Sequence, residues 1–359
     1  MKYLNAKIEV KLLLEKNPLS KKESDKLPYL TLGQVIAIAK SEPITKFLWN
    51  GIKEKSFGLI FGPSKSGKSI FCENLAMNLA AGKKEFLGYP LPGKPDKVLF
   101  IGMEEHWRER VNRNTNQLKG FNSSESKLIR ENYLLQPLEF NKTIKRDEDW
   151  NNLKVTILKS KAKVVVIDSI TRLNHGKLEN SADAEKIMQN LRAICHDCGI
   201  TLICIHHTPK IHDAELTMDS IKGSSVFAQE SDFAIGIRAT AKKVRYMKNV
   251  FFRYSSDNDE MVREFNIDKN CSIKYAGEVE EQKILKSMDR RVNNTNRDLI
   301  FDYFKKNPSI LSNTNDLVNL FKDKLKIKKR QIMSYLSELI NDGSILNPSR
   351  GQYILKSNV

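Results

Sequence analysis

The segment from Gly62 to Ser69 limits the folds and ligands open to this chain more than any other segment, because it fits the spacing G-x-x-x-x-G-K-[ST]. Glycines in such a loop let backbone N–H groups converge on a bound anion. Lys68 adds a point charge, and the Ser69 hydroxyl can coordinate Mg²⁺. Apolar residues at 57–61 predict a buried strand before the loop, and those at 70–79 recur at roughly helical spacing, so the helix aims its positive end at the same anion. The residues expected to contact a nucleotide triphosphate are Gly62, Pro63, Ser64, Lys65, Ser66, Gly67, Lys68, Ser69 and Ile70.

The chain of 359 residues is strongly basic, with 60 Lys and Arg against 43 Asp and Glu and a formal net charge of +17. An excess of this size favours a polyanionic partner, with nucleic acid ahead of an anionic membrane surface. A lysine-rich genome is the alternative explanation, and charge alone does not separate the two. The length is sufficient for two domains, and no apolar run approaches the ~18 residues of a membrane span.

The five cysteines point to a reducing compartment. An odd number in a chain of this size argues for free thiols, and the N-terminus lacks the apolar core of a signal peptide, so we expect a cytoplasmic location. Cys195 and Cys198 have the C-x-x-C spacing of a zinc site, with His206 and His207 nearby in the sequence. A structural zinc site normally needs a second well-spaced pair, so buried free thiols are the preferred interpretation.

From about residue 45 to residue 275, short apolar segments alternate with amphipathic ones. This alternation predicts an α/β domain whose mostly parallel sheet is covered by helices on both faces. Strands are expected at 57–61, 98–101, 164–167, 200–205, 233–237 and 250–254. Helices are expected at 31–41, at 182–195 and in a segment that ends at 153–159.

Three further segments flank this domain, which we place at residues 30–275. Residues 1–29 form a basic N-terminal arm, and their sequence does not decide between a short docking helix and a loose chain. Residues 276–296 are polar and predict a linker. Residues 297–359 combine expected helices at 297–306, 313–325 and 328–341 with a small hairpin, an order that resembles a winged helix-turn-helix.

Polar residues follow three of the expected strands. Asp168 comes directly after the apolar run 164–167, where a Walker B carboxylate holds Mg²⁺ beside the phosphate loop. Glu104 and Glu105 follow the strand at 98–101, and a glutamate there can orient or deprotonate an attacking water. His206 and His207 end the strand at 200–205, where an imidazole can bond a γ-phosphate or the attacking water.

In four segments the chain resembles the RecA-like ATPases of the plasmid RepA-type hexameric helicase group. The segments are GPSKSGKS, IGMEE, VVVIDSITRL and ICIHHTPK, and the resemblance covers about residues 40–255. It implies a RecA-like P-loop core that uses ATP and Mg²⁺, with Glu104 as catalytic base and His206 or His207 as phosphate sensor. It also implies that Lys210 reaches toward a neighbouring subunit of a homo-oligomer such as a hexamer.

Relatives in that group also carry an arginine that enters the adjacent subunit's site after a Gly-Ser segment. Here residues 222–232 read KGSSVFAQESD and contain no arginine. Arg238 and Arg245 are the nearest candidates, and Lys222 is a cation that can substitute for them. The departure leaves the trans-acting finger without a firm position, and loss of such a group costs several kcal/mol of transition-state stabilisation.

A cluster of basic residues precedes and enters the expected helix 328–341, the helix whose N-terminal end would enter a major groove. Lysines there neutralise phosphates and give an affinity that falls steeply with salt. A protein-docking module with a solvated basic face is the alternative. The residues expected to contact DNA are Lys328, Lys329, Arg330, Gln331, Ser334 and Arg350.

These features favour an ATP-hydrolysing, ring-forming DNA motor, in particular a replicative helicase of a plasmid, phage or other mobile element. Single-stranded DNA would pass through the ring, and double-stranded DNA would bind the C-terminal module. The polar loop 210–223 would face the channel of such a ring, and a mobile surface loop without contact to DNA is the equal alternative. An ATP-switched initiator, loader or regulator with slow hydrolysis is the alternative. A small-molecule phosphoryl transferase ranks last, because it needs no basic C-terminal module.

Overall fold

The computed structural model describes residues 29–140, 143–173, 181–209, 211, 214–221, 226–240, 244–255 and 261–356, without the side chains of 181, 228 and 286–295. The expected N-terminal arm, Lys210 and Lys222 lie outside these residues, apart from residue 29.

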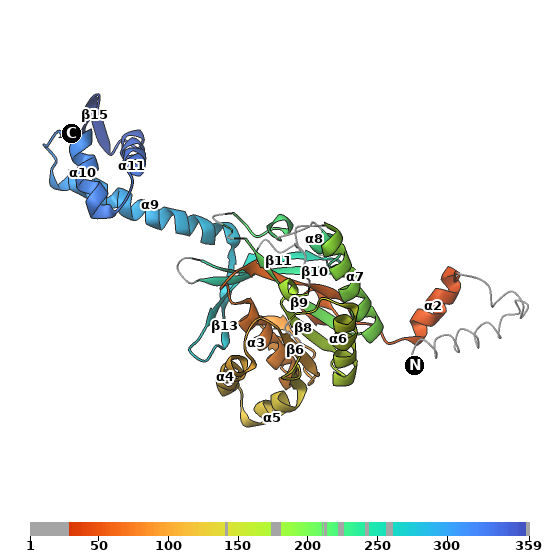
Figure 1. The fold of residues 1–359 in the computed structure, drawn as a ribbon. Coiled ribbons are helices and arrows are strands. Elements are labelled where there is room, and N and C mark those ends of the chain that lie inside the picture. The colour runs from red at the N-terminus through yellow and green to blue at the C-terminus, as the bar shows by residue number, and fades with distance from the viewer. Residues whose placement is uncertain are drawn as a thin grey trace, which may run out of the picture.

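A nine-stranded sheet forms the centre of the molecule, in the order β13-β12-β11-β10-β3-β9-β8-β6-β7 (Figure 1). The strands from β10 to β7 in this order run parallel, and β11, β12 and β13 add to one side as antiparallel neighbours. This arrangement confirms the expected α/β fold with a mostly parallel sheet. The strands are β3 (Phe57–Pro63), β6 (Val98–Gly102), β7 (Tyr133–Leu135), β8 (Val164–Asp168), β9 (Thr201–Thr208), β10 (Phe233–Ala239), β11 (Arg245–Phe252), β12 (Met261–Ile267) and β13 (Ile273–Glu280).

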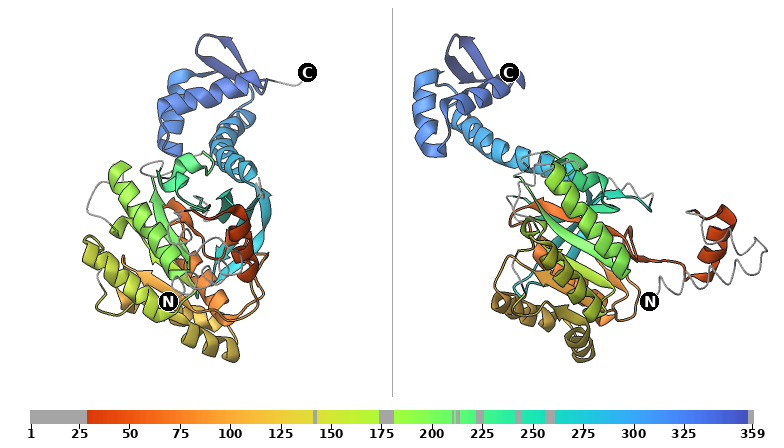
Figure 2. Two further views of the ribbon diagram at one scale, coloured as in Figure 1. Left: turned by 90° about the vertical axis from the view of Figure 1, so that its right-hand side faces the viewer. Right: turned by 45° about the vertical axis from the view of Figure 1, so that its right-hand side comes forward.

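The central strands are apolar on both faces, and the pleat sends alternate side chains to different helices. Leu59 and Phe61 of β3 join the core that contains α6 (Asp147–Ser160) and α7 (Ser181–Cys198). Ile60 points the other way, into the core that contains α3 (Lys68–Ala81). Helices therefore cover both faces of the sheet, as Figures 1 and 2 show.

The smaller elements connect these layers. Two helices follow β6, and α4 starts within two residues of Glu105, with the His106 side chain accepting a hydrogen bond from the N–H of Arg108. The helices after β6 are α4 (Trp107–Gln117) and α5 (Ser123–Asn132). The remaining short elements are α8 (Val226–Gln229), β1 (Phe47–Trp49), β2 (Ile52–Lys53), β4 (Glu85–Phe86), β5 (Tyr89–Pro90) and 3₁₀ turns at Leu118–Gly120, Ile170–Arg172 and Met218–Ser220.

The helix expected at 31–41 is present as α2 (Leu32–Ser41), with a capping box between Thr31 and Gln34. None of its side chains is buried, and Figure 1 shows it standing away from the sheet. Leu32 is 75% exposed, although it is one of several apolar residues on this short helix. A helix this short is marginal on its own in water, so its apolar side chains need a surface to cover them.

The segment expected as a linker, residues 276–296, is not an irregular connection. It contains the end of β13 and the first part of a long helix, α9 (Glu281–Lys306), which continues through the expected helix at 297–306. Glu281 is 2% exposed and accepts hydrogen bonds from the Tyr246 hydroxyl (2.8 Å) and the Leu216 N–H (3.0 Å). Polar composition suggested a loop, but these buried contacts tie the start of the helix to the sheet.

The C-terminal unit packs around its own core. α10 (Thr314–Leu325) and α11 (Lys329–Asn341) match the expected helices, and Ile332 and Leu336 of α11 are buried against Ile300 and Phe304 of α9. A three-stranded sheet completes the unit in the order β14-β16-β15. Its strands are β14 (Ser312–Asn313), β15 (Ile345–Ser349) and β16 (Gln352–Leu355).

Candidate nucleotide-binding site

The phosphate loop leaves β3 and enters α3 through backbone conformations that glycine adopts readily. Gly62 has a φ of 154° and Gly67 a φ of 102°. A Cβ on Gly62 would lie 2.0 Å from the carbonyl oxygen of Ile237, so even alanine would force the backbone to move. Gly67 is the N-cap of α3, and the loop therefore presents the first N–H groups of the helix to an anion.

The Lys68 side chain is folded over its own loop. Its Nζ donates hydrogen bonds to the carbonyl oxygens of Gly62 (2.9 Å) and Pro63 (2.8 Å). Burial lowers the pKa of Lys68 to about 8, and the nearby carboxylates of Asp168 and Glu104 partly oppose this effect. A triphosphate on the loop would place a negative charge directly beside this buried ammonium, whose present hydrogen-bond partners are neutral carbonyl groups.

Asp168 and Ser69 meet at the carboxyl edge of the sheet, joined by a hydrogen bond between their side chains. Asp168 is 3% exposed and its pKa is raised by burial. Its Oδ1 has no hydrogen-bond partner among the described residues. A buried carboxylate oxygen beside a hydroxyl fits Mg²⁺, which takes few protein oxygens and keeps water and phosphate oxygens as its other ligands. Ser69 and Asp168 are therefore the residues that would hold the ion.

Glu104 lies just past the end of β6, among hydroxyl groups and one imidazole. Its carboxylate accepts hydrogen bonds from the Ser169 hydroxyl and from Thr171 Oγ1 (3.0 Å). The hydrogen bond with His207 is the main reason that the pKa of Glu104 falls to about 2, against the opposing effect of burial. The side chain is still 31% exposed, so a water molecule can reach it.

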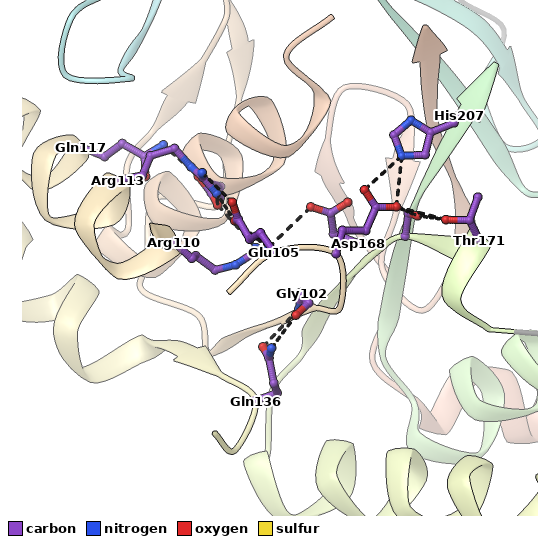
Figure 3. A network of polar contacts seen from close by, with 12 residues as sticks. Gly102, Glu105, Arg110, Arg113, Gln117, Gln136, Asp168, Thr171 and His207 are labelled. Atoms are coloured by element: carbon purple, nitrogen blue, oxygen red, sulfur yellow. Dashed lines mark hydrogen bonds and ion pairs between the residues drawn. The ribbon is translucent and has the colours of Figure 1, made fainter. Parts of the chain in front are cut away.

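The pleat of β9 separates the two histidines that the sequence left as alternatives. His207 is beside Gly62 in the register of β9 and β3, and its Nε2 lies 3.2 Å from Glu104 Oε1 (Figure 3). His206 is fully buried and stacks on Phe227, with ring centroids 5.0 Å apart. His207 is therefore the one that meets the other candidate catalytic groups.

Glu105 has a different environment from Glu104, although the two are adjacent in sequence. It forms ion pairs with Arg110 (2.9 Å) and Arg113, both on α4 (Figure 3). The same two arginines contact Glu73 of α3, which is fully buried. Sequence reasoning did not select Glu73, Arg110 or Arg113. The available signal was two arginines three positions apart on a helix that directly follows the acidic pair.

The candidates for a trans-acting cation lie in different places in the structure. Arg238 is 4% exposed and donates to the carbonyl oxygens of Ala214 and Ile211, within its own subunit. This placement is a correction, because a guanidinium held inside its own subunit cannot serve a neighbour. Arg245 lies against the phosphate loop, where its Nε is 3.5 Å from the position a Cβ of Gly67 would take. Lys210 and Lys222 are outside the described residues.

The residues expected to contact DNA lie on the C-terminal unit and are exposed. Lys328 caps α11, and its N–H donates to Gln331 Oε1 at 3.2 Å. Ser334 donates to Glu338 at 3.3 Å on the next turn. The basic residues Lys328, Lys329 and Arg330 thus gather at the N-terminal end of this helix.

The C-x-x-C pair ends α7, at some distance in the fold from the phosphate loop. Cys195 is buried, and its thiol donates to the carbonyl oxygen of Ile200 at 3.0 Å. Burial raises the pKa of Cys195 to about 12. Across the part of the chain that the structure describes, no group of three or more His, Cys, Asp or Glu side chains is arranged for a metal ion. In the same residues, no helix has the length and apolar character needed to cross a membrane.

A family profile for an AAA domain, AAA_25, matches residues 24–213, which is more than half of the chain. No curated protein sequence matches the chain significantly. Among solved structures, a KaiC-like protein from the hyperthermophilic archaeon Pyrococcus horikoshii OT3 is similar with a TM-score of 0.44 and 17% identity, over 63% of this chain and 91% of that one. The chain belongs to the AAA_25 family of AAA domains.

Proposed function

We propose that this protein is an ATP-hydrolysing, ring-forming DNA motor, most specifically a RepA-like replicative helicase of a plasmid, phage or other mobile element. The observation that carries the proposal is the contact between Glu104 and His207, 3.2 Å apart at the edge where the phosphate loop also ends. A glutamate and an imidazole in hydrogen-bond contact can couple the presence or loss of the γ-phosphate at one strand to a movement of the side chain on the next strand.

The chemistry follows from what each side chain can do. The loop N–H groups and Lys68 hold the triphosphate, while Ser69 and Asp168 hold Mg²⁺, which supplies charge neutralisation at the phosphate oxygens when bound. Glu104 accepts a hydrogen bond from the attacking water and orients it. The hydrogen bond with His207 holds the pKa of Glu104 at about 2, so the carboxylate is ionised and can accept the proton of the attacking water. His207 then exchanges its contact with Glu104 for one with phosphate.

The DNA-binding part of the proposal rests on the C-terminal unit. Its order of three helices and a three-stranded sheet resembles a winged helix-turn-helix, in which α11 would be the recognition helix. Lys329 and Arg330 are exposed at the end of α11 that would enter the major groove. Their position favours phosphate contacts on double-stranded DNA.

The ring is supported by α2 and by the chemistry of the site. Val35 and Ile36 are 46% and 45% exposed, so the helix offers an apolar surface to another subunit. The phosphate loop lies at the carboxyl ends of β3 and β9, where a cation from a neighbour would approach it, as in other P-loop enzymes that act in trans.

Steady-state ATP hydrolysis tests the proposal. A ring-forming motor should hydrolyse faster per subunit as protein concentration rises, and single-stranded DNA should raise the rate about 10-fold or more. Double-stranded DNA that binds only α11 should raise it much less. Slow, DNA-independent hydrolysis with ATP-dependent assembly would overturn the motor.

That outcome would support the second candidate function, an ATP-switched DNA-binding initiator, loader or regulator. The buried position of Arg238 favours it, because an arginine held within its own subunit does not reach a neighbour's site, and turnover would then be slow. In such a protein, nucleotide would control assembly rather than movement.

Reversing two charges on α11 is expected to weaken binding to duplex DNA. Lys329→Glu with Arg330→Glu removes two phosphate contacts and should lower the affinity at least about 10-fold, with a salt slope smaller by roughly 2. Titration of a labelled duplex at several salt concentrations measures both quantities. Lys305→Glu with Lys306→Glu is the matched control, since both are exposed at the end of α9 and change the charge equally. An equal loss in both double variants would show that only net charge matters.

A further inference from the structure

Arg110 is a buried cation that the expected chemistry of the site does not use. It is 2% exposed, and its Nη2 lies 2.9 Å from Glu105 Oε1 and 3.7 Å from Asp168 Oδ2 (Figure 3). Its Nη1 lies 3.4 Å from Glu73 Oε1. One guanidinium therefore faces three carboxylates, and one of them is the candidate Mg²⁺ ligand.

A charge at this depth is costly unless it is paired, so the site is built around it. The guanidinium stacks on Phe100, with its carbon 4.4 Å from the ring centroid. Gly102 leaves room for it, because a Cβ there would lie 2.1 Å from Nη2. Gly102 is itself fixed by Gln136, which donates to its carbonyl oxygen at 2.7 Å and accepts from its N–H at 3.1 Å.

Arg113 lies on the same helix as Arg110 and contacts two of the same carboxylates, but it does not contact the candidate metal ligand. It donates to Glu73 Oε2 from Nε (2.8 Å) and to Glu105 Oε2 from Nη1 (2.9 Å). Among the described residues, the hydrogen bonds and ion pairs to the Asp168 carboxylate come from Ser69 and Arg110 and not from Arg113. The two arginines thus share their structural partners and differ at Asp168.

We propose that Arg110 is a positioning residue that orients the Asp168 carboxylate for Mg²⁺. Its Nη2 lies 3.7 Å from Oδ2, while Oδ1 has no hydrogen-bond partner among the described residues and is the oxygen left for the ion. Arg110 also pairs with Glu105, so one guanidinium connects the candidate metal ligand to the segment between β6 and α4. The inference rests on the proposed use of Mg²⁺ and ATP at this site.

The test compares Arg110→Met with the matched variant Arg113→Met by titrating Mg²⁺ into each protein with a fluorescent ATP analogue. We expect Arg110→Met to raise the Mg²⁺ concentration for half-saturation about 10-fold or more, as loss of a group that orients a metal ligand does. Its affinity for the analogue without Mg²⁺ should stay within about 3-fold of the wild type, since Lys68 and the loop are intact. Arg113→Met should change the Mg²⁺ requirement by less than about 3-fold, even where both variants lose thermal stability.

Gly102→Ala keeps the charge of Arg110 but pushes its guanidinium aside, and should raise the Mg²⁺ requirement in the same direction. If Arg110→Met does not fold, Gly102→Ala takes its place in the comparison with Arg113→Met. Equal Mg²⁺ requirements in the two methionine variants would overturn the proposal, as would an unchanged requirement in Gly102→Ala. Because Mg²⁺-dependent binding is measured at equilibrium, a wild type that binds but does not hydrolyse would count against the motor and not against Arg110.

Discussion

Lys68→Ala is expected to lower ATP hydrolysis at least about 100-fold, because it removes the buried ammonium that is folded over the phosphate loop. The alanine variant leaves the carbonyl oxygens of Gly62 and Pro63 without the donor they have now. Its affinity for ATP should therefore fall as well, measured by equilibrium titration. Lys84→Ala is the control, because Lys84 is exposed beyond the end of α3.

The pH dependence gives an independent signature of Lys68. Its pKa is lowered to about 8 in the free protein, so the ammonium is present below this pH and is lost above it. We expect the affinity of the wild type for ATP to decline as pH rises through about 8, by up to ~10-fold per pH unit. The decline should vanish in Lys68→Ala. A wild type with constant affinity between pH 7 and about pH 10 would contradict the assignment.

Glu104→Gln is expected to have the second large effect, lowering kcat by about 10²–10⁴-fold with little change in ATP affinity. The amide keeps the shape of the side chain and removes the charge that orients the attacking water. Single-turnover hydrolysis and nucleotide titration separate the two quantities. Glu109→Gln makes the same chemical change at an exposed position of α4 and should behave as the wild type. A glutamine variant with normal kcat would show that another group orients the water.

The acid side of the pH profile should not report Glu104. A carboxyl group with a pKa of about 2 stays ionised throughout the range in which the protein is assayed. If kcat falls between pH 7 and pH 5, the cause must therefore be another group.

The sequence by itself determined the parts of this protein that depend on local patterns. The strand, the glycine loop and α3 follow from residues 57–79, because glycine conformations and apolar periodicity are properties of a short segment. Asp168 and Glu104 could also be placed, since carboxyl ends of parallel strands share one edge of the sheet. β12 and β13 were not predicted, because half-exposed strands lack a continuous apolar run.

Only the tertiary structure decided which side chains at that edge meet. Because side chains alternate along β9, His207 contacts Glu104, and His206 is buried against Phe227. Arg238 is held within its own subunit, and the polar segment after β13 is helical, because distant residues supply their buried partners. The network of Arg110 was invisible in the sequence for the same reason. Its carboxylates come from α3, from the end of β6 and from β8, and the cost of a buried charge is balanced only where the fold brings all three together.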